Sequence, residues 1–297
     1  MPNQNIGISS ELVYYTGSPT GTRFDSAGSP DDWKRDVASL ASGNRLLLLA
    51  ISIAFSGPLF GLLREGAIGI HLRGPSSCGK TSALIVAGSV WGGGGRNGFC
   101  GTWRATANGL EGVAAAHSGT CLVLDELSEI DPQEAGKAAY ALLNGSGKQR
   151  AGRSGEPRPR LEWRVPILSS GEITLGDKIA EDRGKSARVG VDIRIIDVPA
   201  DGGEGMGIFE FLHGRDSAAA FCDELRQAAL TSYGTAGPKF IRKIAENQEA
   251  TILAAERLID ATVQEPAPAP PADSGANPPV SSAHAGRDYT ITQITSL

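Results

Sequence analysis

The stretch HLRGPSSCGKTSAL, residues 71–84, decides the fold of this chain. It follows an apolar run, residues 67–72, and leads into a segment of helical composition. From Gly74 to Thr81 it matches the pattern G-x-x-x-x-G-K-[ST] in full. Glycines let backbone N–H groups turn toward phosphates, and the N-terminus of the following helix adds about half a positive charge. The sequence therefore predicts a phosphate-binding loop between a strand and a helix.

Two residues of this loop have separate expected roles. Lys80 is expected to reach the β- and γ-phosphate oxygens, and the Thr81 hydroxyl is expected to ligate Mg²⁺. ATP and Mg²⁺ are thus the cofactors that the loop predicts. The residues expected to contact the nucleotide are Gly74, Ser76, Ser77, Cys78, Gly79, Lys80, Thr81 and Ser82.

A phosphate loop needs an acidic partner, and residues 120–126, TCLVLDE, supply two carboxylates after an apolar run. In a parallel sheet this places Asp125 and Glu126 at the carboxyl edge, beside the loop. We expect Asp125 to support Mg²⁺ through water, and Glu126 to orient and deprotonate the attacking water. An ordinary strand with an acidic end is the alternative, and the upstream phosphate loop favours the catalytic interpretation.

A second apolar run, WRVPILSSGE, residues 163–172, also ends in polar residues. A hydroxyl at this place is chemically able to sense the γ-phosphate, and Ser170 is preferred over Ser169 for that role. A strand that ends in a serine turn is the alternative.

Arginines further along are candidates for a finger that acts on the nucleotide of a neighbouring subunit, because transition-state charge rewards a planar cation. The candidates are Arg183, Arg188 and Arg194. The sequence does not choose among them, and Arg194 is taken as the candidate catalytic residue. A finger that acts in trans predicts a homo-oligomer, with a ring as the expected form.

The segment GSGKQRAGRSGEPRPRLEWR, residues 145–164, is basic: it holds six Lys or Arg residues and two Glu residues, a net charge of +4. The whole chain has a net charge of −5, which excludes wholesale wrapping of nucleic acid but allows a local contact. A Gly/Pro-rich basic loop suits a phosphate backbone, and we expect Lys148, Arg150 and Arg153 to contact single-stranded or duplex DNA. A solvated loop without a ligand is the alternative.

From about residue 66 to residue 199, short β-branched runs alternate with helical stretches, which predicts a parallel sheet with helices on its faces. The expected strands are residues 68–72, 120–124, 164–168 and 191–198, and the expected later helices are 217–230 and 238–263. The fold class is therefore α/β, a three-layer P-loop NTPase of the additional-strand, helicase-like class, with a small C-terminal helical segment. The expected organisation is a flexible lead-in (1–28), a helical segment that packs on the core (29–65), the ATPase core (66–215), a helical appendage (216–263) and a Pro/Ala-rich tail (264–297).

Residues 46–63 are uncharged and meet the lower length limit for a membrane span. Because Gly57 and Pro58 interrupt this run and it leads straight into the phosphate loop, we expect a buried helix pair and no membrane partner. The N-terminus lacks the pattern of a signal peptide, and the four cysteines have neither metal-ligand nor disulfide-like spacing. A reduced, cytoplasmic location is the expectation.

With these residues laid out, the chain resembles the family catalogued as domain of unknown function 927, whose members are often labelled superfamily II helicase-like. The resemblance spans about residues 30–262 and is carried by NRLLLLAISIAFSGPLFGLL, HLRGPSSCGKTSAL, TWRATANGLEGVAAAH, LVLDELSEIDP, AAYALLNGSGKQRAGR, WRVPILSSGE and DIRIIDVPAD. It implies a replication ATPase of a mobile element or phage, of the ring-forming type. The chain departs from the family in having a short N-terminal part and a Pro/Ala-rich tail, which puts in doubt a sensor arginine from the C-terminal side.

The function expected from these observations is Mg²⁺-dependent ATP hydrolysis by a helicase-like ATPase that acts on DNA. Two alternatives stay open: an ATP-driven switch or loader that moves no strand, and a truncated module that binds nucleotide without turnover. A kinase is a weaker third alternative, because no acceptor site is visible.

Overall fold

The computed structural model describes residues 23–64, 66–95, 98–149, 156–157, 159–182 and 194–264. Its centre is a five-stranded sheet in the order β2-β3-β4-β1-β5, in which every pairing is parallel. The strands are β1 (Gly69–Arg73), β2 (Gly101–Thr102), β3 (Leu122–Asp125), β4 (Ile167–Gly171) and β5 (Ile195–Pro199). Strand β4 lies between the strand of the phosphate loop and the strand of the acidic pair, so the α/β fold with an additional central strand is confirmed.

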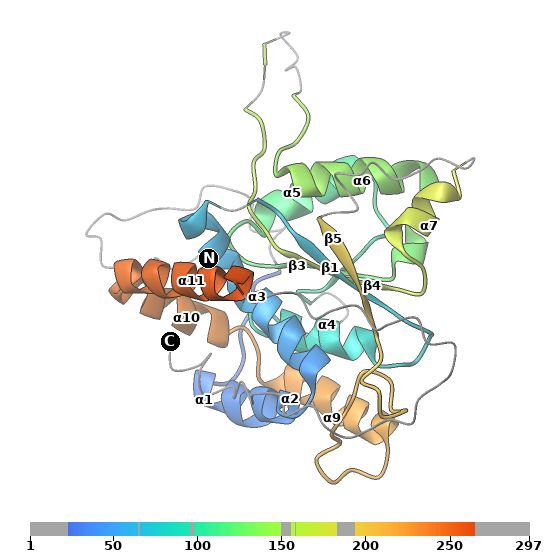
Figure 1. Cartoon of the computed structure of the whole chain (residues 1–297), viewed down its shortest axis with the longest axis vertical. Helices are drawn as coiled ribbons and strands as arrows, with labels where there is room; N and C mark the ends of the chain where they lie inside the picture. The colour runs from blue at the N-terminus through green and yellow to red at the C-terminus, as the bar shows by residue number, and fades with distance from the viewer. Residues whose placement is uncertain are drawn as a thin grey trace.

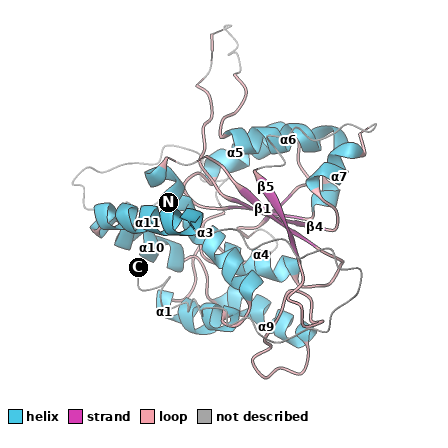
Figure 2. Ribbon diagram, viewed as in Figure 1, coloured by secondary structure: helices cyan, strands magenta, loops and turns pink. Residues whose placement is uncertain are grey.

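Helices cover both faces of the sheet, as Figure 1 and Figure 2 show. One layer consists of α5 (Ala107–Ala116), α6 (Pro132–Asn144) and α7 (Leu175–Ala180), with the short helix η3 (Leu127–Glu129) just before α6. The other layer holds α3 (Arg45–Leu63), α4 (Lys80–Gly88) and α9 (Ala218–Thr231). Further helices complete this second side: α1 (Pro30–Trp33), η2 (Lys34–Ala38), α2 (Ser39–Ala41), α10 (Ala236–Glu246) and α11 (Gln248–Gln264).

Alternation along the central strands builds a core on each side of the sheet. On β3, Leu122 and Leu124 belong to the core beneath α5 and α6, whereas Val123 belongs to the core beneath α3 and α4. Adjacent residues of β4, Ile167 and Leu168, divide between the two cores in the same way. Because successive side chains of a strand point to opposite faces, an unbroken apolar run is what a strand covered on both faces requires.

Helix α3 is continuous, so the predicted pair of helices is wrong. Pro58 has no N–H to donate to the carbonyl of Ala54, one turn earlier, but the Trp91 indole N–H donates to that carbonyl at 2.8 Å. Gly57 allows the helix to approach the sheet, because a Cβ atom there would lie 1.7 Å from the Thr120 carbonyl oxygen. These two residues therefore serve packing rather than termination.

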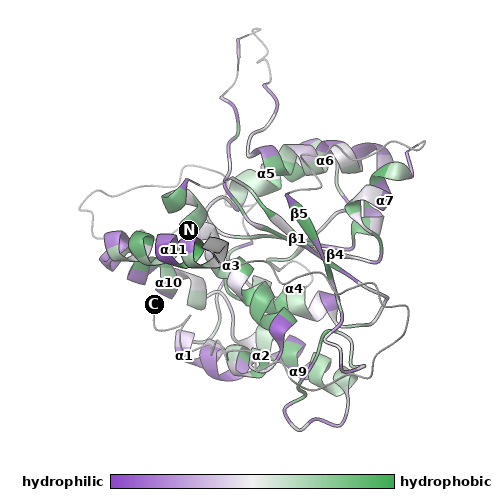
Figure 3. Cartoon of the chain, in the orientation of Figure 1, coloured by the Kyte–Doolittle hydropathy of each residue, from purple (hydrophilic) through white to green (hydrophobic). Residues whose placement is uncertain are grey.

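The same helix is the one among the described residues that is long and apolar enough to cross a membrane. Of its most apolar window, 33% is buried inside the structure, and Figure 3 shows its strongly hydrophobic colouring. Its buried side chains, among them Leu47 and Ala54, contribute to the core above α4. The absence of a membrane partner stays a prediction.

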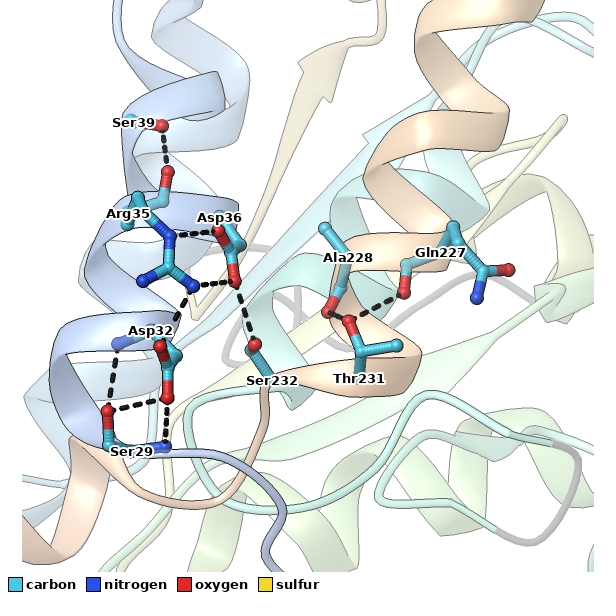
Figure 4. A network of polar contacts seen from close by, with 9 residues as sticks. All are labelled: Ser29, Asp32, Arg35, Asp36, Ser39, Gln227, Ala228, Thr231 and Ser232. Carbon is cyan, nitrogen blue, oxygen red and sulfur yellow. Dashed lines mark hydrogen bonds and ion pairs between the residues drawn. The ribbon is translucent and has the colours of Figure 1, made fainter.

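The N-terminal helices are fastened to α9 by the polar network in Figure 4. Ser29 and Asp32 form a capping box at the start of α1. Arg35 pairs with Asp32 at 2.8 Å and with Asp36 at 2.7 Å, and the Ser232 hydroxyl, just after α9, donates to Asp36 at 3.2 Å. The N-terminal helices and the end of α9, which are far apart in the sequence, thus lie side by side.

Several element boundaries differ from the prediction. Strand β4 begins at Ile167 rather than at residue 164, since Pro166 has no N–H to add to the ladder. Strand β2, with two residues, was not predicted, and the helix expected over residues 238–263 is divided at Asn247. The predicted lead-in up to residue 22 and the tail from residue 265 lie outside the described residues.

Candidate nucleotide and metal site

The carboxyl ends of β1, β3 and β4 meet at one edge of the sheet and carry the candidate site. β1 leads directly into the phosphate loop, and its Leu72 is in register with Ser170 on β4. β3 ends at Asp125, one residue beyond the Leu124–Ser169 pair. The sheet topology therefore brings the loop, the acidic residue and the predicted sensor together.

The loop has the backbone shape that turns N–H groups inward. Ser77 and Gly79 have positive φ values of 62° and 100°, and α4 starts at Lys80. At Gly79 a Cβ atom would lie 2.9 Å from the Ile208 side chain and 3.1 Å from the Phe209 ring. The position thus requires glycine both for its conformation and for its space.

Lys80 is folded back over the loop that precedes it. Its ammonium donates to the Gly74 carbonyl at 2.8 Å and to the Pro75 carbonyl at 2.6 Å, and the side chain is buried. A buried ammonium needs such partners. A phosphate oxygen that entered the loop would offer the same ammonium a charged acceptor in place of two neutral carbonyls.

Two hydroxyls share one carboxylate at the centre of the site. Thr81 Oγ1 donates to Asp125 Oδ2 at 2.9 Å, and the Ser170 hydroxyl donates to Asp125 Oδ1. The Glu126 backbone N–H lies 3.3 Å from Ser170 Oγ and 3.2 Å from Asp125 Oδ1. The two predicted metal residues, Thr81 and Asp125, are therefore adjacent.

This oxygen cluster fits Mg²⁺, which prefers hard oxygen ligands and binds through one or two protein groups together with phosphate and water. Among the described residues there is no group of three or more His, Cys, Asp or Glu side chains that could hold a metal alone. A hydroxyl beside a carboxylate would therefore suit a magnesium ion that is held together with a nucleotide, and the metal itself stays a prediction.

Glu126 has a strained backbone, with φ 55° and ψ 82°. Its carboxylate accepts from the Ser128 hydroxyl at 2.6 Å and from the Ser128 N–H at 3.3 Å. Lys178 in turn donates to the Ser128 carbonyl at 3.0 Å. The Glu126 carboxylate is therefore hydrogen-bonded to η3, and its role as a base stays a prediction.

Ser169, the less favoured sensor, belongs to a buried network that the sequence analysis missed. Trp103 Nε1 lies 2.8 Å and His71 Nδ1 lies 2.9 Å from Ser169 Oγ, while His71 Nε2 lies 3.0 Å from the Ile173 carbonyl. A carbonyl oxygen can only accept, so neutral His71 carries its proton on Nε2, and its Nδ1 accepts from the Ser169 hydroxyl. Burial lowers the pKa of His71, which favours this neutral form. The sequence signal that could have revealed this network is His71, a histidine within an otherwise apolar strand.

A glycine-rich segment after β5 lies against the phosphate loop and was also missed. The Ile208 N–H donates to the Cys78 carbonyl at 2.9 Å, and a Cβ atom at Gly207 would lie 2.3 Å from that oxygen. The buried Asn44 side chain accepts from the N–H groups of Glu210 and Phe211 at 2.9 Å and 3.1 Å. The segment is thus anchored to the start of α3.

The remaining loop residues differ in accessibility. Ser76 and Ser77 are exposed, and Cys78 is half-buried. The Ser82 hydroxyl is buried against α9, where it donates to Cys222 Sγ at 3.4 Å and lies 3.2 Å from Arg226 Nε. Its predicted contact with the nucleotide stays a prediction.

Arg194 lies at the opposite edge of the sheet, at the amino end of β5, where it donates to the Leu143 carbonyl at 3.1 Å. It is therefore remote from the phosphate loop of its own chain, and its role as a finger stays a prediction. Arg183 and Arg188 lie outside the described residues.

The basic segment projects from the end of α6, as Figure 1 shows. Its two described arms are antiparallel: Ser146 pairs with Glu162, and the Gly147 N–H donates to the Leu161 carbonyl at 2.8 Å. Lys148 is exposed on one arm, whereas Arg150 and Arg153 lie outside the described residues. We call the described part of this segment, residues 145–149, 156–157 and 159–164, the basic excursion.

Residues 1–161 match the family model described as domain of unknown function (DUF927). The chain belongs to the DUF927 family. The family match thus confirms the resemblance and extends it to the first residue, although it ends before β4. No curated protein matches the DUF927 chain.

Among solved structures, the DUF927 chain is similar to an active helicase described as SCCmec type IV Cch, with a TM-score of 0.62 and 22% identity. The alignment covers 83% of this chain and 44% of that chain, so this chain spans less than half the length of the helicase. NtrX from Brucella abortus in complex with ATP is also matched, with a TM-score of 0.33, 20% identity, and coverage of 53% of this chain and 36% of that chain. The likeness to the helicase shows that the two chains share the α/β fold described above.

Proposed function

We propose that this DUF927 chain binds ATP at the phosphate loop, hydrolyses it with Mg²⁺, and couples turnover to DNA in the replication of a mobile element or phage. The observation that carries the proposal is the Asp125 carboxylate shared by the Thr81 and Ser170 hydroxyls at the end of the phosphate loop. A bare structural strand end would not need two hydroxyls on one acid beside such a loop.

Binding would use groups that already face the loop. The N–H groups presented by the turn at Ser77 and Gly79 would hold phosphate oxygens, and Lys80 would exchange its two backbone carbonyl partners for them. Thr81 and Asp125 would hold Mg²⁺, which supplies neutralisation of the charge on the β- and γ-phosphates. Ser170, whose hydroxyl donates to Asp125, would respond to whether the γ-phosphate is present.

Hydrolysis would require the Glu126 carboxylate to leave Ser128. Once released, it could orient a water molecule and accept its proton as the water attacks the γ-phosphorus. Since two hydrogen bonds hold the carboxylate on Ser128, this release is a step with its own free-energy cost.

Steady-state ATP hydrolysis with and without single-stranded DNA tests the proposal. Lys80→Ala should lower turnover by about 100-fold, because a contact to a charged group contributes up to about 3 kcal/mol. Glu126→Gln should lower it by roughly 10²- to 10⁴-fold, the usual contribution of a general base. The exposed Lys34→Ala is the matched control for a lost lysine charge and should hydrolyse ATP like wild type.

The position of Glu126 favours a second candidate, a nucleotide-binding module or switch without turnover. In that case the carboxylate stays on Ser128 and ATP binds without hydrolysis. Wild-type chain that binds ATP in a Lys80-dependent way and shows no turnover, with or without DNA, would exclude the motor function and support this candidate.

We also propose a homo-oligomer, with a ring as its form. Arg194 is remote from its own phosphate loop, so a finger role requires the nucleotide of a second copy. Sedimentation velocity with ATP should show an assembly whose disruption abolishes turnover. A monomer with full ATPase activity would contradict this part of the proposal.

A further inference from the structure

A pocket lies at the edge of the sheet opposite the phosphate loop. Its volume is about 720 Å³, and its walls come from the segments that enter β3, β4, β1 and β5 and from the foot of the basic excursion. This volume is in the range of pockets that hold small ligands, roughly 300–1,000 Å³. The pocket is therefore distinct from the nucleotide site and separated from it by the length of the strands.

Three arginines line this pocket, from three separate segments. Arg64 follows α3, Arg164 precedes β4, and Arg194 precedes β5. Glu162 is the one acidic residue among the lining residues, and the Ser118 and Ser146 hydroxyls add neutral donors. The formal charge of the lining is therefore positive, in a chain whose net charge is −5.

Most of the guanidinium donors are available to a ligand. Arg164 makes one long contact, 3.5 Å to the Gly61 carbonyl, and Arg194 makes one bond to the Leu143 carbonyl. Arg64 is exposed, and its side chain makes no hydrogen bond or ion pair among the residues that the structure describes. A guanidinium carries five N–H donors in a planar fork that matches phosphate oxygens.

We propose that Arg64 and Arg164 in this pocket bind a phosphodiester group of a nucleic-acid strand that runs along the basic excursion, while Arg194 keeps the finger role proposed above. The pocket and the excursion are continuous, because Ser146, Glu162 and Arg164 belong to both. Phosphate contacts by arginine position a strand without reading its sequence. The inference rests on the proposed contact with DNA and names the place where the backbone is held.

Fluorescence anisotropy of a labelled single-stranded oligonucleotide, as a function of salt, tests the pocket. Loss of one phosphate contact should make the slope of log K against log salt shallower by about 0.7, which weakens binding about fivefold at 0.1 M salt. We expect this change in Arg64→Gln, a larger one in the double variant with Arg164→Gln, and partial retention in Arg64→Lys. Arg242→Gln, an exposed arginine on α10, is the matched control, and thermal melting reports whether each variant is folded.

Three results would overturn the inference. If the folded variants keep the oligonucleotide affinity and the salt slope of wild type, the arginines serve only to cap the C-terminal carbonyl groups of helices. Loss of DNA-free turnover with unchanged oligonucleotide affinity would assign them to the nucleotide of a neighbouring copy. Binding of ADP or inorganic phosphate to the Lys80→Ala chain, abolished by Arg64→Gln while oligonucleotide affinity is unchanged, would assign the pocket to a free phosphate group.

The ATPase proposal is separable from the pocket. A chain that hydrolyses ATP in a Lys80-dependent way but binds no oligonucleotide would contradict the pocket and the DNA contact, and would leave the ATPase intact. Oligonucleotide binding that depends on Arg64, without any ATP turnover, would contradict the ATPase proposal and leave the pocket and the DNA contact supported.

Discussion

At the scale of single residues, the Ser128–Glu126 pair sets how readily the candidate base is released. The Ser128 hydroxyl donates to the carboxylate at 2.6 Å, in an exposed position where water can replace it. A hydrogen bond of this kind contributes about 1 kcal/mol, so its removal should raise the released fraction about fivefold. Ser128→Ala should therefore raise ATP turnover without DNA about fivefold, measured in the steady state.

Ser52→Ala is the matched control for that substitution, because its hydroxyl donates only to the Leu48 carbonyl of its own helix. It should leave turnover unchanged. Slower turnover in Ser128→Ala would mean instead that Ser128 holds Glu126 in its working orientation.

At the scale of elements, the continuity of α3 depends on the indole of Trp91, in the turn after α4. Trp91→Phe removes the N–H that serves the Ala54 carbonyl and leaves a buried acceptor unsatisfied, at a cost of about 1–3 kcal/mol of unfolding free energy. Pro58→Ala restores the helix's own donor to that carbonyl. Urea unfolding should therefore show that Pro58→Ala stabilises the Trp91→Phe chain by more than it changes the wild-type chain.

The double-mutant cycle separates the hydrogen bond from packing, because the volume lost at Trp91 is the same in both backgrounds. Additive effects of the two substitutions would show that the Ala54 carbonyl finds another partner. The local sequence could not predict this arrangement, since Gly57 and Pro58 signal a break and Trp91 is far along the chain.

At the scale of the whole molecule, two buried histidines make stability sensitive to mild acid. Burial lowers the pKa of His71, in the Trp103 network on one side of the sheet, and of His117, against Phe99 on the other. The unfolded chain binds protons near the ordinary histidine pKa of about 6.5, whereas the folded chain resists them. The contribution of these two histidines to the free energy of unfolding is therefore complete above about pH 7. It decreases as the pH falls below 6.5 toward the lowered pKa values of the folded chain.

Denaturation midpoints between pH 7.5 and pH 5 measure this loss, and His71→Gln with His117→Gln should flatten the profile. Carboxylates whose pKa is lowered by hydrogen bonds, such as Asp177 with Thr174, lose their contribution only at more acidic pH, near their ordinary value of about 4. An unchanged slope in the histidine variants would place the acid sensitivity elsewhere.

Local patterns were sufficient for the phosphate loop, the acidic strand end and the parallel sheet, because each is specified by consecutive residues. Ser170 contacts Asp125 and Ser169 does not, but the role of Ser170 as a sensor stays a prediction. What could not be predicted depends on distant partners, such as the anchoring of the glycine-rich segment by Asn44. A two-residue strand such as β2 has too short a run to produce a periodic signal.

Strand β4 connects the pocket at one edge of the sheet with the candidate nucleotide site at the other. Arg164 precedes this strand and Ser170 lies near its end, and all five of its residues are buried. At about 3.3 Å per residue, the two positions are roughly 20 Å apart along one extended segment. A buried strand hydrogen-bonded on both sides does not stretch or bend independently of its neighbours. If Ser170 senses the γ-phosphate as proposed, a displacement of Ser170 on phosphate release would reach the base of the basic excursion along this one strand, without an intervening hinge.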